Sequence, residues 1–219
     1  MEEKPQASSG GGFSGKLSGL YNKLFGVIQF TLGICLLPFA YSSTLAFFAQ
    51  FNAIEASLQG CFWAGVITFL IIYHFAWEPL PVYTKGHHLL ELIFNFFKPL
   101  VKVAPFLLPV YTIVLFILFG IASAFTRESW LFRAGMFSFG LSIVLHLVFS
   151  SKSMRGKKGD FLKGNYIFGF SLIYILNLFI LAFGLSLIFN TFSFVDFSNA
   201  TYSVARDIFY AVFKQLFLR

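Results

Sequence analysis

Long apolar segments recur along this chain, and the polar residues are gathered in the short stretches between them. A helix needs about 20 apolar residues to cross a bilayer. Five segments approach or exceed that length: residues 24–48, 58–77, 104–125, 130–149 and 166–189. The pattern therefore predicts an all-α membrane protein with about five transmembrane helices.

Two further segments are expected to form helices that do not span the bilayer. Residues 86–97 lie between prolines and, at 1.5 Å per residue, would reach only about 18 Å, so a short half-inserted helix is predicted there. Residues 202–218 are amphipathic, because Val204 and Ile208 share one helical face while Asp207 and Lys214 share another. Such a helix lies on a membrane surface or binds a protein partner.

These segments define the domain organisation. Residues 1–20 are rich in Gly and Ser and are predicted to be a disordered polar tail. Residues 21–190 form a polytopic transmembrane domain, and residues 191–219 form an extracytoplasmic segment that carries the amphipathic helix.

Composition and charge agree with a membrane protein. Only 11% of the residues are charged, against about 25% in a soluble domain. The net charge of +7 comes from loops, since 11 of the 16 Lys and Arg residues fall on one side of the predicted spans. The positive-inside rule then places the N-terminus in the cytoplasm and the C-terminus outside, in a bacterial inner membrane. The expected partners are the lipid bilayer and other membrane-protein subunits, and no nucleic acid.

The clearest candidate for a functional site is the polar stretch Lys85-Gly-His-His-Leu-Leu-Glu91 after the second span. Ionisable groups are costly beside the hydrocarbon layer. His87 and Glu91 would lie one helical turn apart and could share a metal ion. His146 and Asp160 are the candidates to complete a metal site, and His88 is the candidate base. Alternatively, this is an interfacial helix whose polar side chains face the cytoplasm.

Polar residues within the later spans point to helix packing. Small or polar residues recur every four positions in the fourth span, at Ala134, Ser138, Ser142 and His146. Such a stripe lets helices approach closely, and His146 would be hydrogen-bonded within it. Asn177, midway along the fifth span, is expected to bridge helices by hydrogen bonds. A haem held by His74 and His146 is a weaker alternative.

The stretch Gly86-His87-His88-Leu89-Leu90-Glu91 resembles the G-H-E-x-x-H metal helix of the site-2-type intramembrane zinc metallopeptidases. Gly86 and His87 match that pattern, whereas His88 and Glu91 replace the family's glutamate and second histidine. A later acid supplies the family's third ligand, and Asp160 is the candidate here, although the L-D-G element is absent. The resemblance implies a degenerate relative, with HHxxE in place of HExxH. No cofactor is expected for such a protein, and zinc is the metal that the resemblance would allow.

Three functions follow from these features. The leading hypothesis is a non-catalytic scaffold or accessory subunit of a membrane assembly. One alternative is an active intramembrane metallopeptidase with altered ligands. The other is a small transporter or channel subunit, which is disfavoured because the first and fifth spans contain no Asp, Glu, Lys, Arg or His.

Overall fold

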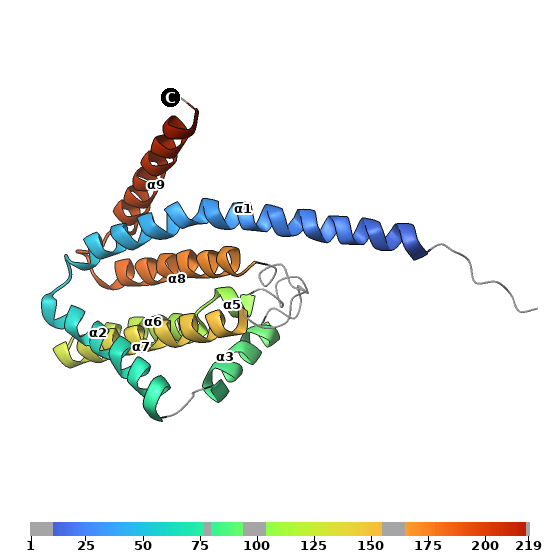
Figure 1. Ribbon diagram of the computed structural model, residues 1–219. Helices are drawn as coiled ribbons and strands as arrows, with labels where there is room; N and C mark the ends of the chain where they lie inside the picture. Colours follow the sequence, from blue (N-terminus) through green and yellow to red (C-terminus); the bar gives the residue numbers. More distant parts are fainter. Residues whose placement is uncertain (1–10, 77–79, 94–103, 155–164, 218–219) are drawn as a thin grey trace, which may run out of the picture.

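The computed structural model describes residues 11–76, 80–93, 104–154 and 165–217, which form helices and no strands. The helices are α1 (Gly11–Phe51), α2 (Ala56–Ile71) with a π-helical continuation (Ile72–Ala76), α3 (Leu80–Ile93), α5 (Ala104–Leu107), α6 (Val110–Phe125), α7 (Ser129–Met154), α8 (Tyr166–Ile188) and α9 (Phe194–Phe217) (Figure 1). The chain is an all-α membrane protein, as the apolar pattern predicts.

Four helical segments are long and apolar enough to cross a membrane: Lys23–Phe51, Ala56–Phe75, Ser129–Met154 and Tyr166–Ile188. The third predicted span, residues 104–125, is divided into the one-turn helix α5 and the 16-residue helix α6. Pro109 lies at the division. Proline has no backbone N–H to continue the helical hydrogen bonds, so the chain breaks there.

The helices pack side by side in a bundle. α1 lies along α8, α8 along α7, and α7 against α2, while α6 packs on α7 and α8 (Figure 1). The closest approach joins α2 to α7 through two glycines. A Cβ on Gly65 would lie 2.0 Å from the Phe137 carbonyl oxygen, and a Cβ on Gly140 would lie 2.1 Å from that of Phe62. The two backbones can therefore touch only because both positions lack a side chain.

Two helices begin earlier than the sequence pattern predicts. α1 begins at Gly11, so residues 11–20 are helical although they were expected to belong to a disordered tail. Once a helix has formed, each added residue gains one hydrogen bond, which favours such an extension. α3 begins at Leu80 rather than at residue 86, with Pro81 in its first turn, where an N–H is not needed.

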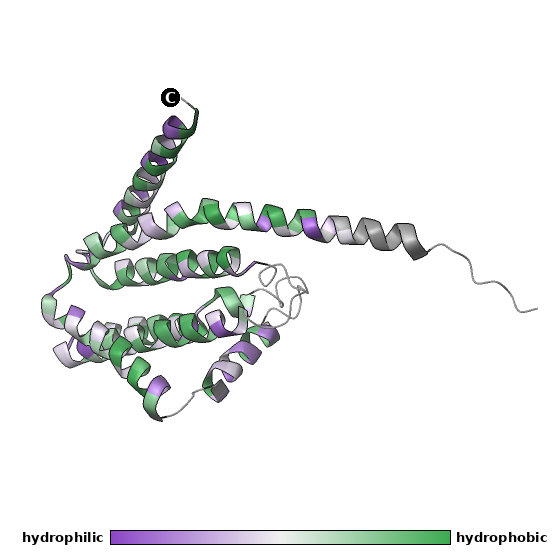
Figure 2. Ribbon diagram, viewed as in Figure 1, coloured by the Kyte–Doolittle hydropathy of each residue, from purple (hydrophilic) through white to green (hydrophobic). Residues whose placement is uncertain are grey.

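The amphipathic C-terminal helix is confirmed, and it folds back across α1. The rings of Phe209 and Phe39 lie 5.7 Å apart, and the Ser193 N–H donates to Gln50 Oε1 at 3.0 Å. Phe197, Thr201 and Ala205 form the buried stripe of α9. Figure 2 shows alternating polar and apolar residues on α9 and α3, in contrast with the apolar surface of α8.

Candidate functional site

The polar residues of the candidate site gather where α3, the α5–α6 break and the second half of α7 meet, which we call the α3 end of the bundle. The His87 ring lies 5.1 Å from the ring of Phe106, and the rings of Tyr83 and His146 are 6.2 Å apart. His87 and His146 both line a cavity of about 10 Å³, roughly the space of one water molecule. The structure thus brings together two histidines that the sequence places on different helices.

The HHxxE stretch lies on α3, and its acid contacts both histidines. His87 Nε2 is 3.4 Å from Glu91 Oε1, so the predicted shared helical face is confirmed. His88 Nδ1 is 3.1 Å from Glu91 Oε2, while the His88 side chain is 86% exposed. The candidate base therefore does not line the small cavity beside His87 and His146.

His146 supports the break between α5 and α6. Its Nε2 lies 3.1 Å from the Phe106 carbonyl oxygen and 3.2 Å from Ser150 Oγ. Because a carbonyl oxygen can only accept, Nε2 carries the proton in this bond, and the lone pair of the neutral ring lies on Nδ1. The predicted hydrogen bond of His146 is thus confirmed. Its partner is a backbone carbonyl of α5, just before the break at Pro109.

Asn177 has the same role for the next residue of α5. Its Nδ2 donates to the Leu107 carbonyl at 3.1 Å and to the Ile173 carbonyl at 2.8 Å. This confirms the predicted helix bridge, which joins α8 to α5. Broken helices are tolerated at membrane depth only where the freed backbone groups are satisfied. His146 and Asn177 satisfy two consecutive carbonyls, those of Phe106 and Leu107.

The polar stripe of α7 is only partly a packing seam. Ser142 is buried and its hydroxyl lies 2.9 Å from that of Thr112, which ties α7 to α6. Ala134, at the start of the stripe, is exposed. The closest helix contact instead uses Gly140, on a different face of α7, because only glycine permits backbone contact there.

Two tyrosines that the sequence analysis did not single out complete the α3 end. The Tyr83 hydroxyl is 3.3 Å from Ser150 Oγ, and Tyr111 donates to the Val82 carbonyl. Burial raises the pKa of the Tyr83 phenol, partly offset by its hydrogen bonds with Ser150 and Ser153, so the phenol stays protonated at neutral pH. Tyr83 precedes His87 by one helical turn, and this spacing is the signal that could have identified it.

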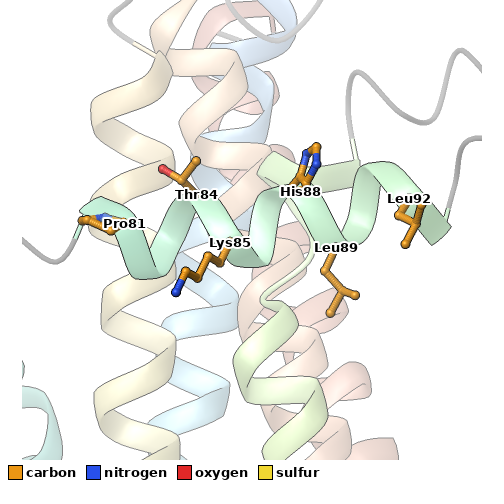
Figure 3. Close-up of a pocket in the computed structure, with 6 residues that line it drawn as sticks. All are labelled: Pro81, Thr84, Lys85, His88, Leu89 and Leu92. Atoms are coloured by element: carbon orange, nitrogen blue, oxygen red, sulfur yellow. The ribbon is translucent and has the colours of Figure 1, made fainter.

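The outer face of α3 lines an open pocket of about 670 Å³. Its described lining residues are Pro81, Thr84, Lys85, His88, Leu89 and Leu92 (Figure 3). Lys85 and Leu89 point to one side of the helix in Figure 3, and Thr84 and His88 to the other. α3 therefore presents His88 and Lys85 outward while Tyr83 and Gly86 are buried.

The predicted metal ligands do not form one cluster in the described part of the chain. Across those residues, no group of three or more His, Cys, Asp or Glu side chains is placed to hold a metal ion. His87 and Glu91 are neighbours, His146 is bonded to a carbonyl, and Asp160 lies outside the described residues. For the haem alternative, His74 is exposed while His146 is buried. Comparisons with known protein families, with curated proteins and with solved structures found no match to this chain.

Proposed function

We propose that this integral membrane protein is a non-catalytic scaffold or accessory subunit of a membrane assembly. The hydrogen bond from His146 Nε2 to the Phe106 carbonyl carries the proposal. A metallopeptidase-like site would need His146 as a further ligand beside His87 and Glu91. The bond gives this histidine a structural role as the support of a broken helix, and among the described residues no group of three or more His, Cys, Asp or Glu side chains is placed to hold a metal.

The exposed apolar surface of α1 also supports a role in assembly. In the most apolar stretch of this helix only 11% of the residues are buried, against 39% in α7 and in α8. Leu24, Val27 and Ile28 are among its exposed side chains. Exposed apolar surface in a bilayer contacts lipid tails or the helices of other subunits.

On this proposal the Gly86–Glu91 stretch is the degenerate form of a site-2-type metal helix. His88 takes the place of the catalytic glutamate, and it contacts Glu91 at 3.1 Å. An active metallopeptidase with altered ligands is the second candidate function. The 3.4 Å separation of His87 Nε2 and Glu91 Oε1 favours it, because these are two zinc-binding groups on one helical face.

Two measurements on the wild type and one double variant separate these functions. In mildly solubilised native membranes, the protein is expected to migrate in a complex larger than its own 24.7 kDa chain. The double variant His87→Ala/Glu91→Ala should keep that complex, because neither side chain is needed for assembly. Elemental analysis of the purified wild type should find no stoichiometric zinc.

The opposite results would favour the enzyme. Migration as a single chain would contradict the scaffold proposal. Stoichiometric zinc in the wild type, lost from His87→Ala/Glu91→Ala and kept in Lys85→Ala, would support a metal centre. Lys85 is a suitable control because it lies on the same helix and is exposed.

The proposed orientation has the N-terminus in the cytoplasm and the C-terminus outside a bacterial inner membrane. It is supported by the basic residues, of which 11 of 16 fall on the proposed cytoplasmic side. A C-terminal alkaline phosphatase fusion is expected to be active, and a C-terminal green fluorescent protein fusion to be dark. Fusions placed after Met154, at the end of α7, should give the reverse pattern. Fluorescence from the C-terminal fusion would contradict this orientation.

A further inference from the structure

A further cavity lies at the end of the bundle opposite to α3, where α6 ends, α7 begins and α8 ends. Its volume is about 360 Å³, within the range of ligand-binding pockets. Three aromatic side chains line one part of it, Phe116, Phe119 and Phe132, and Ser123 adds a hydroxyl group. This cavity shares no lining residue with the site around His87 and His146.

The polar groups of this cavity lie where the helices end. Arg127, in the connection between α6 and α7, and Asn190, after α8, are both lining residues and both exposed. Phe119, by contrast, is buried. The described lining residues include one cation and no acid. The cavity thus combines a cluster of three phenylalanine rings with polar groups and one positive charge.

We propose that this cavity binds an amphipathic anion with a single hydrocarbon chain and a carboxylate head. The Arg127 guanidinium would hold the carboxylate, for which its planar donors are well matched. The hydrocarbon chain would lie among the three phenylalanine rings. Arg127 is the one charged residue among the described lining residues, and its positive charge favours an anionic ligand over a neutral one.

The size of the cavity selects one chain rather than two. At about 30 Å³ for each water-sized group, a cavity of about 360 Å³ holds roughly a dozen such groups. That space accommodates most of one acyl chain. A phospholipid would need space for two chains.

Two glycines determine the shape of this cavity. A Cβ on Gly184 would lie 2.3 Å from the Phe116 ring, so the absence of a side chain there allows that ring to pack on α8. A Cβ on Gly120 would meet no atom within 4 Å, although Gly120 lines the cavity. A larger side chain at position 120 would therefore fill the cavity without displacing its walls.

The test measures binding of palmitate to the full-length, detergent-purified protein by titration in native mass spectrometry. The wild type should bind one palmitate, with affinity reduced at least about tenfold in Arg127→Gln, the loss expected for one charge-assisted hydrogen bond. Gly120→Leu should reduce the affinity to a similar degree by occupying the cavity. Gly60→Leu is the matched control, because a Cβ there also meets no atom within 4 Å and Gly60 does not line the cavity.

Three probes decide the chemistry of the ligand. Hexadecanol, with the same chain and no charge, should bind at least about tenfold more weakly than palmitate. Phosphatidylglycerol should not displace palmitate at equal concentration, and inorganic phosphate should not bind. Equal binding of hexadecanol and palmitate, displacement by the phospholipid, or unchanged affinity in Gly120→Leu would each overturn the proposal.

Discussion

Replacing Gly140 with alanine is expected to force α2 away from α7 and to lower the free energy of unfolding by about 3 kcal/mol, the upper end of the range for overpacking a core. The added methyl group would lie 2.1 Å from the carbonyl oxygen of Phe62, which is backbone and cannot rotate away. Thermal unfolding of the detergent-solubilised protein, followed by circular dichroism, measures the effect.

A matched control separates this clash from a general effect of alanine in a membrane helix. Gly60 lies on α2, and a Cβ there would meet no atom within 4 Å. Gly60→Ala is therefore expected to leave stability unchanged or to raise it by up to about 1 kcal/mol, from helix propensity alone. Gly65→Ala should repeat the loss seen with Gly140→Ala. Equal thermal unfolding midpoints for Gly140→Ala and Gly60→Ala would refute the close contact between α2 and α7.

Replacing His146 with leucine should lower the free energy of unfolding by about 2 kcal/mol, because the buried hydrogen bond from Nε2 to the Phe106 carbonyl would be lost. Asn177→Leu should cost a similar amount by freeing the Leu107 carbonyl. His146→Gln should recover most of the loss, since a side-chain amide can donate to the same oxygen. Thermal unfolding in detergent measures all three variants.

The choice of replacement tests the structural role of His146. If His146 were needed as a metal ligand, glutamine would not restore the stability of the protein. If His146 acts as a hydrogen-bond donor, glutamine should restore it. His74→Leu is the control, because His74 is exposed in the π-helical continuation of α2 and should tolerate the change. Failure of His146→Gln to improve on His146→Leu would contradict the proposed support of the α5–α6 break.

The sequence was a good guide wherever one physical rule dominated. The long apolar segments predicted α7 and α8 with bounds close to those in the structure, because the length of a membrane helix follows from the thickness of the hydrocarbon layer. The amphipathic segment after residue 201 is also helical, although α9 begins earlier, where Ser193 Oγ accepts the Asp196 N–H. Asn177 bridges helices as predicted, since a polar amide at that depth must find a partner.

The sequence was a weaker guide where the outcome depended on contacts between distant segments. Pro109 indicated a break in the third span, but nothing in the local sequence showed that His146 would bond the Phe106 carbonyl. The four-residue stripe on α7 suggested the wrong face for the closest packing, because Gly140 meets α2 only through the tertiary arrangement. The cavity around Arg127 could not be predicted, since three helices have to converge to form it.

The division of the third predicted span has a consequence for the surrounding lipid. α6 has 16 residues and is therefore about 24 Å long, shorter than the hydrocarbon core of about 30 Å. Its exposed side chains include Ile117, Leu118 and Ile121, whereas α5, which would have extended it, is buried. A bilayer that contacts this face would have to thin locally to match α6, at a cost of fractions of a kcal/mol per Å. If the protein assembles with other subunits, a neighbour with an equally short helix would relieve that cost at the face of α6.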